Sequence, residues 1–202
     1  MHEAAVEKLK KSDRVLAGII KKVGPCRLKK AQGTGSYFEA LCEAIVYQQL
    51  NGKAAATIFG RFKAIYGDGL FPKPRQILKT TDAKLRAAGL SGQKLSYLKD
   101  LAFKVEEGTL DLDTVDSLPD EAVVERLTAV KGIGPWTAEM FLMFRLGRPD
   151  VLPVGDYGFR TGVKKAYGLK ELPSEKKLLA LSEPWRPHRS AATWYFWQSL
   201  TV

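Results

Sequence analysis

The chain has 202 residues, of which 45% are hydrophobic and 27% charged. That length suits one large domain or two small lobes, and no apolar run approaches the roughly 18 residues that a membrane span needs, so we expect a soluble protein. Its 32 basic and 22 acidic residues give a net charge of +10. This charge favours a polyanionic partner, with nucleic acid first. A merely basic protein remains the alternative, because lysines commonly cover solvated helix faces.

Cysteine and histidine are too scarce for several kinds of site. Cys26 and Cys42 cannot form a disulfide framework, and they fall short of the four thiolates that an iron–sulfur cluster takes. Because His2 and His188 are the only histidines, a zinc site or a Ser-His-Asp triad is not expected. The N-terminus shows no secretory signal pattern, so we expect a protein that stays inside the cell.

Apolar residues recur at helical spacing along nearly the whole chain, whereas alternating runs are scarce, so the sequence predicts an all-α fold. The spacing and caps predict helices at 15–23, from Ser36 toward Gln49, at 58–65, from 81 or 82 to near 89, and at 95–105. Further helix starts are expected near Pro119, Pro135, Pro173 and Pro187. The expected loops cover 24–35, 67–75, 108–118 and 148–155.

The most informative stretch covers residues 127–159. A helix ending near Val130, a tight turn at 132–134 and a helix beginning at Pro135 describe two helices joined by a hairpin. A helix N-terminus favours a phosphate, and Lys131 adds positive charge beside it. The N–H groups at this N-terminus belong to Gly134, Trp136 and Thr137. Such contacts position DNA without reading its bases, although a Gly-x-Gly turn by itself is more often only a turn.

The whole stretch resembles the helix-hairpin-helix plus Gly/Pro-Asp signature of base-excision DNA glycosylases, because Val-Leu-Pro-Val-Gly-Asp follows the second helix and ends at Asp156. Residues 44–55 (AIVYQQLNGKAA) and 89–102 (GLSGQKLSYLKDLA) look like earlier family segments. Residues 185–197 (WRPHRSAATWYFW) look like the C-terminal helix of AlkA-type 3-methyladenine DNA glycosylases. The resemblance, which covers 36–197, implies an enzyme that binds double-stranded DNA, extrudes a damaged base and hydrolyses its N-glycosidic bond.

Two positions carry the chemistry that this resemblance implies. Asp156 is expected to be the catalytic carboxylate, which stabilises oxocarbenium character at C1′ and orients or deprotonates water. It could also cap the helix that follows, and the two roles can coexist. Where strand-cutting members carry a Schiff-base lysine, this chain has Trp136, which cannot act as that nucleophile. We therefore expect a monofunctional enzyme without AP lyase activity, of the branch that acts on cationic alkylpurines such as 3-methyladenine and 7-methylguanine.

The resemblance also implies a wedge, a substrate pocket and a DNA-backbone site. The wedge loop, with Gln49 or Leu50 as the preferred wedge and a polar helix end as the alternative, consists of Gln48, Gln49, Leu50 and Asn51. The expected pocket residues are Trp136, Met140 and Trp197, whereas Trp194 or Tyr195 is more typical of core. The expected backbone contacts are Lys131, Gly132, Gly134, Thr137 and Lys94.

A structural cation is the one bound group that the resemblance suggests, since no cofactor is required for catalysis and no iron–sulfur cluster is expected. The main-chain carbonyls of Thr128, Val130 and Ile133 match the family's hairpin site for sodium or potassium.

We expect two helical lobes with DNA in a cleft between them: a helical barrel at 36–147, and a second lobe combining 1–35 with 148–202. One alternative function is a glycosylase for uracil, hypoxanthine or an oxidised purine. The other is a non-catalytic helix-hairpin-helix module, which would need neither Asp156 nor the wedge loop. We expect a monomer that binds no membrane. Its place would be the nucleoid-containing cytoplasm of a bacterium or archaeon, or the nucleus of a eukaryote.

Overall fold

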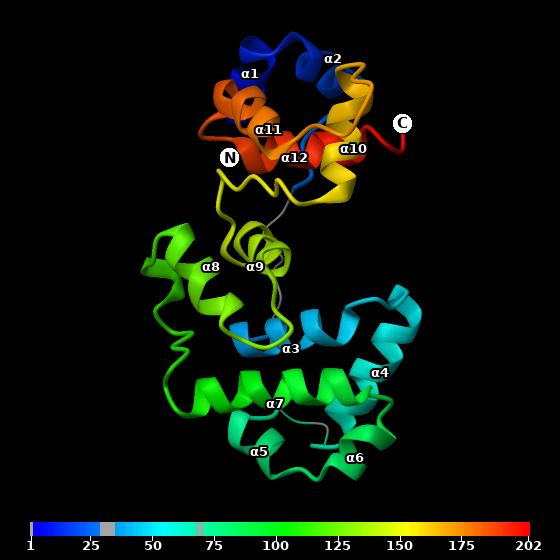
Figure 1. Ribbon diagram of the computed structural model, residues 1–202, viewed down its shortest axis with the longest axis vertical. Helices are drawn as coiled ribbons and strands as arrows, with labels where there is room; N and C mark the ends of the chain where they lie inside the picture. Colours follow the sequence, from blue (N-terminus) through cyan, green and yellow to red (C-terminus); the bar gives the residue numbers. More distant parts are fainter. Residues whose placement is uncertain (1, 29–34, 68, 70) are drawn as a thin grey trace. The chain divides into compact units, whose positions relative to one another are not determined.

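A computed structural model describes residues 2–28, 35–67, 69 and 71–202. All regular elements in this part of the chain are helical, which confirms the predicted all-α fold (Figure 1). The backbone divides into two compact units. The terminal unit combines residues 1–31 with 142–202, and the central unit consists of residues 32–141. Within the described ranges, none of the helices has both the length and the apolar character needed to cross a membrane.

The helices of each unit follow in chain order. The terminal unit contains α1 (His2–Ser12), α2 (Arg14–Val23), the π-helical turn η2 (Leu142–Leu146), α10 (Tyr157–Ala166), α11 (Glu175–Ser182), the 3-10 turn η3 (Glu183–Trp185) and α12 (Arg189–Gln198). The central unit contains α3 (Tyr37–Tyr47), α4 (Gly52–Ala64), α5 (Pro74–Lys79), α6 (Asp82–Ala87), α7 (Gly92–Glu106), the 3-10 turn η1 (Val115–Ser117), α8 (Asp120–Thr128) and α9 (Pro135–Phe141).

In the terminal unit, α12 packs against α2 and α10 around an aromatic core. Phe196 lies in that core, with its ring centroid 5.1 Å from that of Trp185 and 5.8 Å from that of Phe159. Gly162 allows the close approach of α10 and α12, because a Cβ there would lie 2.5 Å from the carbonyl oxygen of Phe196. Burial of such large aromatic side chains is the main source of stability in a small helical unit.

Asp13 ties three segments of the terminal unit together. Its Oδ1 accepts the N–H groups of Val15 and Leu16 and so caps α2, while its Oδ2 accepts the indole N–H of Trp185 at 2.8 Å and the hydroxyl of Tyr167. Burial alone would raise the pKa of Asp13, but these hydrogen bonds outweigh it and hold the pKa below its ordinary value.

In the central unit, α7 packs against α3, α5 and α6. Rings from α3 and α4 meet at Phe71, whose centroid lies 6.0 Å from those of Phe38, Phe59 and Phe62. Local caps set the helix starts, as the sequence predicts: the hydroxyl of Ser36 accepts the N–H of Glu39 at the start of α3.

The sequence pattern did not predict every helix boundary correctly. The region 67–75 was expected to be a loop, but α5 begins at Pro74. Pro119, Pro173 and Pro187 do precede helices, but they lie before the first helical turn and not in it, as the caps at Ser174 and His188 show. Segment 148–155 is irregular, as predicted. Residues 29–34 of the expected 24–35 loop, and residues 68 and 70, lie outside the described residues.

Candidate active site and nucleic-acid interface

Asp156 occupies the N-cap of α10, and its carboxylate is fixed by two donors. Its Oδ1 accepts the backbone N–H of Phe159 at 2.5 Å and the indole N–H of Trp197 at 2.7 Å. Asp156 is half-buried, so this carboxylate is oriented and yet reachable from solvent. The cap is present in the structure, and the tryptophan contact is an additional restraint that a cap does not need.

Gly158 and Phe144 complete the surroundings of this carboxylate. A Cβ at Gly158 would lie 3.3 Å from both Asp156 Oδ1 and Trp197 Cδ1, so a glycine leaves room for the indole to reach the carboxylate. The ring of Phe144 stacks on Trp197 with centroids 6.2 Å apart and planes 16° apart. Sequence reasoning missed both residues, because Phe144 lies in a plain amphipathic stretch and Gly158 follows a recognised cap.

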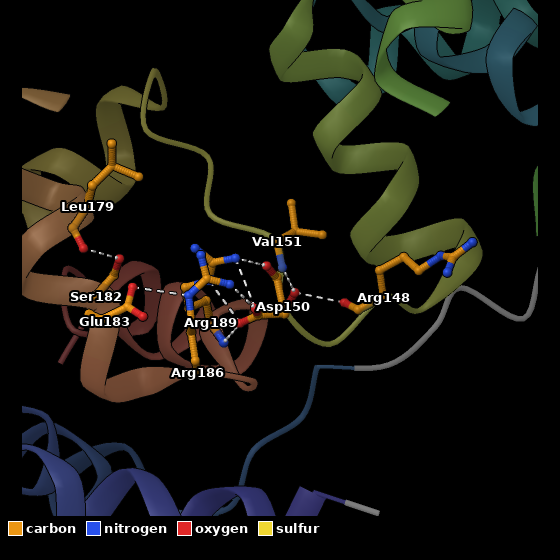
Figure 2. A network of polar contacts seen from close by, with 9 residues as sticks. Arg148, Asp150, Val151, Leu179, Ser182, Glu183, Arg186 and Arg189 are labelled. Atoms are coloured by element: carbon orange, nitrogen blue, oxygen red, sulfur yellow. Dashed lines mark hydrogen bonds and ion pairs between the residues drawn. The ribbon is translucent and has the colours of Figure 1, made fainter. Parts of the chain in front are cut away.

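The loop that leads to Asp156 is joined to the N-terminus of α12 (Figure 2). The hydroxyl of Ser190 donates to the carbonyl of Arg148 at 2.7 Å and accepts the N–H of Val151 at 2.9 Å. Asp150 accepts Arg189 Nε at 2.8 Å and Arg189 Nη2 at 2.9 Å. Arg186 also donates to Asp150, at 2.8 Å. Helix α12 therefore holds the loop at one end and contacts Asp156 through Trp197 near its other end.

The hairpin expected in the central unit is present, since α8 ends at Thr128 and α9 begins at Pro135. Gly132 has φ +81°, a conformation that favours glycine, and the N–H of Ile133 donates to the carbonyl of Val130 at 3.1 Å. The ring of Tyr97 lies against Gly132, where an added Cβ would be only 2.0 Å from the Tyr97 Cδ2 atom. The turn is thus held tightly and cannot accept a side chain without a shift.

The carbonyls predicted to bind a cation lie on this turn. Thr128 is the last residue of α8, where final carbonyls lack intrahelical partners, and the carbonyl of Val130 accepts the N–H of Ile133 in the turn. A third carbonyl follows at Ile133. Neutral carbonyl oxygens are suitable ligands for a hard monovalent cation, so the donor set fits the expected sodium or potassium.

Positive charge near the hairpin comes from Lys131, whose side chain is 68% exposed and lies 4.0 Å from Asp100 Oδ1. Its backbone N–H donates to Asp100 Oδ2 at 2.8 Å, so Asp100 anchors the approach to the turn. Gly134 is exposed, and Thr137 is almost wholly buried. Thr137 could therefore contact a phosphate only through its main chain.

Two of the four predicted wedge-loop residues form side-chain hydrogen bonds within the central unit. Gln48 Nε2 donates to the carbonyl of Gly132 at 2.7 Å, and Asn51 caps α4 by accepting the N–H of Ala54 at 2.9 Å. Gln49 has φ +58° and is exposed, and Leu50 is 39% exposed. Both residues preferred as the wedge are therefore exposed to solvent.

Lys94, predicted to contact DNA, donates from Nζ to the carbonyl of Val46 at 2.6 Å. Burial lowers the pKa of Lys94 below its ordinary value. Of the predicted pocket residues, Trp136 is 50% exposed and Met140 half-buried; both lie on α9 of the central unit, whereas Trp197 lies on α12 of the terminal unit. Tyr195 is fully buried, as expected for core.

These features define a class of protein: an all-helical DNA-binding fold with a helix-hairpin-helix and a fixed aspartate at a later helix N-terminus. A family model described as HhH-GPD superfamily base excision DNA repair protein matches residues 42–187. The chain belongs to this superfamily.

Individual proteins similar to this chain are DNA glycosylases. DNA-3-methyladenine glycosylase 1 of Schizosaccharomyces pombe is 37% identical over an alignment of 205 positions. The alignment covers 98% of this chain and 90% of that protein. A solved structure of the S. pombe 3-methyladenine DNA glycosylase in complex with abasic DNA matches with a TM-score of 0.85 and 36% identity, covering 98% of this chain and 97% of that one. A DNA-3-methyladenine glycosidase from Bacillus halodurans matches with a TM-score of 0.85 and 40% identity, covering 96% and 88%.

Proposed function

We propose that this protein is a monofunctional DNA glycosylase of base excision repair, which releases alkylated purines such as 3-methyladenine and 7-methylguanine from double-stranded DNA. The observation that carries the proposal is the carboxylate of Asp156, held by the Phe159 N–H and the Trp197 indole. The names of the similar proteins support the substrate class. Trp136 at the Schiff-base position supports hydrolysis without strand cleavage.

In this mechanism Asp156 acts by electrostatics. Cleavage of the base–sugar bond leaves positive charge near C1′, and a carboxylate oriented beforehand stabilises that charge without reorganising during the reaction. The Trp197 and Phe159 donors keep the carboxylate in one orientation. The same group can orient or deprotonate the attacking water, so that the product is an abasic site.

Cationic bases suit this chain for two reasons. Alkylation of a ring nitrogen improves the base as a leaving group, so a single carboxylate suffices without a general acid. A positively charged base also gains about 0.5–2 kcal/mol from a favourable contact with an aromatic face. The indole of Trp136 is half exposed and can offer such a face, and Trp197 is the second aromatic candidate.

DNA binding would use the hairpin and the wedge loop. Backbone N–H groups at the start of α9, with Lys131, would hold a phosphate, while Gln49 or Leu50 would fill the space left by the extruded base. Thr128, Val130 and Ile133 would hold a structural cation that stabilises the turn. We place the protein with cellular DNA, in the cytoplasm of a prokaryote or the nucleus of a eukaryote, as a monomer.

The test is release of free base from duplexes that contain 3-methyladenine, 7-methylguanine, hypoxanthine, uracil or 8-oxoguanine. Faster release of the two cationic bases than of the others is the expected result. Faster release of uracil or 8-oxoguanine would refute the substrate class, and DNA binding without release of any base would favour the non-catalytic module.

A further inference from the structure

Lys94 lies in the first turn of α7 and reaches the end of α3. Its Nζ donates to the carbonyl of Val46 at 2.6 Å, and Val46 is fully buried. The last carbonyls of a helix lack intrahelical partners, and a cation is favourable there. The wedge loop begins two residues later, at Gln48. The ammonium of Lys94 therefore fixes the last turn of the helix from which the wedge loop starts.

A second contact fixes the same loop from the hairpin. Gln48 Nε2 donates to the carbonyl of Gly132 at 2.7 Å, and Gly132 lies against the ring of Tyr97, another α7 residue. Gln93 Nε2 donates to the Tyr97 hydroxyl at 2.7 Å, which holds that ring. One face of α7 thus supports both the hairpin and the start of the wedge loop.

The loop needs such support because Gln49 adopts φ +58°. A residue with a Cβ rarely adopts this left-handed conformation, and it persists only where neighbouring contacts hold the backbone. Gln48 is bound to Gly132 and Asn51 caps α4, so Gln49 and Leu50 between them are held at both ends.

We propose that Lys94 and Gln48 are positioning residues of the wedge loop, and that Lys94 does not bind a DNA phosphate. The sequence placed Lys94 among the phosphate contacts, but in the structure its ammonium bonds to the protein's own backbone. The proposal rests on the proposed function, because it assumes that Gln49 or Leu50 enters the DNA when a base is extruded. Lys94 acts through the loop and touches neither the base nor the sugar.

Lys94→Met tests this assignment, because methionine keeps most of the apolar stem and removes the ammonium. Lys79→Met is the matched control, since Lys79 is an exposed lysine at the end of α5 in the same unit and its loss removes the same charge. Thermal melting of both variants establishes that they fold. Gln48→Met removes the other contact without changing charge, so it keeps the test valid if Lys94→Met is unstable.

Two measurements separate positioning from phosphate binding. The first is affinity for undamaged duplex at several salt concentrations, where losing one phosphate contact lowers the salt slope by about 0.9. The second is the fluorescence of 2-aminopurine placed beside an abasic-site analogue, which reports unstacking by the wedge. We expect Lys94→Met and Gln48→Met to keep the control's salt slope, to lose most of the fluorescence change and to release 7-methylguanine at least about tenfold more slowly. Lys94→Arg, which keeps a donor, should recover part of both losses.

The proposal is overturned if Lys94→Met lowers the salt slope by about one and weakens binding to every duplex equally, or if its fluorescence change equals that of the control. The proposed function fails separately: wild-type protein would release no alkylated base at all. Even then the fluorescence comparison decides whether Lys94 and Gln48 position the loop.

Discussion

Replacing Asp156 by asparagine isolates the charge of the carboxylate from its structural contacts. Asp156 Oδ1 accepts both the Phe159 N–H and the Trp197 indole N–H, so an asparagine whose amide oxygen takes that place keeps both hydrogen bonds. Exchanging two charge-assisted bonds for neutral ones costs about 1 kcal/mol each. The loss of transition-state stabilisation is larger: removing one fixed electrostatic group costs about 10²–10³ in rate, or roughly 3–4 kcal/mol.

Single-turnover release of 7-methylguanine from alkylated duplex is the assay, with binding to an abasic-site duplex and thermal melting measured on the same samples. We expect Asp156→Asn to lose at least about 10²-fold in rate and to keep its binding to DNA. Asp156→Ala should be less stable by about a further 1 kcal/mol, because it also loses the cap of α10. Release by Asp156→Asn at near the wild-type rate would refute the catalytic role.

Asp13 offers a matched control within the same unit, because it too is a helix N-cap that accepts a tryptophan N–H. Its two oxygens have different partners: Oδ1 caps α2, and Oδ2 accepts hydrogen bonds from Trp185 and Tyr167. Asparagine places an NH₂ group against the N–H of Trp185, which is fully buried, and an unpaired buried donor costs about 1–3 kcal/mol. Asp13→Asn should therefore lower the melting temperature and leave base release unchanged below that temperature.

Three further results follow from the same contacts. Because Trp136 stands at the Schiff-base position, the product should be an intact abasic site, and good-yield borohydride trapping of a protein–DNA adduct would contradict this. Replacing exposed Gly134 by a bulky residue should weaken binding to damaged and undamaged duplex alike, with a smaller salt slope; a loss confined to damaged duplex would place the hairpin in the base pocket. Burial alone would raise the pKa values of Asp13 and Asp100, but hydrogen bonds hold both below the ordinary value. These two carboxylates therefore bind protons more readily in the unfolded chain than in the folded protein. The stabilisation that these two carboxylates contribute should thus be present above about pH 4 and be lost as the pH drops below it; urea unfolding that shows no such loss would contradict the assignment.

Local sequence predicted the helices and the hairpin because their determinants lie within a few residues of each other. Ser36 caps the helix that begins at the next residue, and the φ of +81° at Gly132 is what a tight Gly-x-Gly turn demands. The cap at Asp156 could be predicted for the same reason, because it lies within a contiguous motif. Helix α5 was not predicted because Lys73 at its N-cap is not a typical capping residue, whereas Thr81 caps the equally short α6.

The contacts that organise the site join residues far apart in the chain, which a single sequence does not pair. Trp197 meets Asp156 across 41 positions, and Gln48 meets Gly132 across 84. Lys94 is a third example, for which the family resemblance suggests a phosphate contact. Only the fold shows that its ammonium reaches the end of α3, 48 positions away.

Trp197 combines two contacts that substitutions can separate. Its indole N–H binds Asp156, and its ring stacks on Phe144. Phenylalanine at 197 keeps an aromatic ring for the stack and for a cationic base, but it has no donor for the carboxylate. A hydrogen bond to a charged group contributes about 1.5–3 kcal/mol, which corresponds to roughly a 10- to 150-fold change if all of it acts on the rate.

We therefore expect Trp197→Phe to slow the release of 3-methyladenine and of 7-methylguanine by the same factor, about tenfold or more, with little change in DNA binding. Trp197→Ala also removes the aromatic face, so it should slow release further and reduce the advantage of cationic bases over hypoxanthine. Single-turnover rates on the three substrates measure both effects. A wild-type rate in Trp197→Phe would show that catalysis does not use the indole–carboxylate bond, and equal rates in the two variants would show that the ring at this position contributes nothing to binding the base.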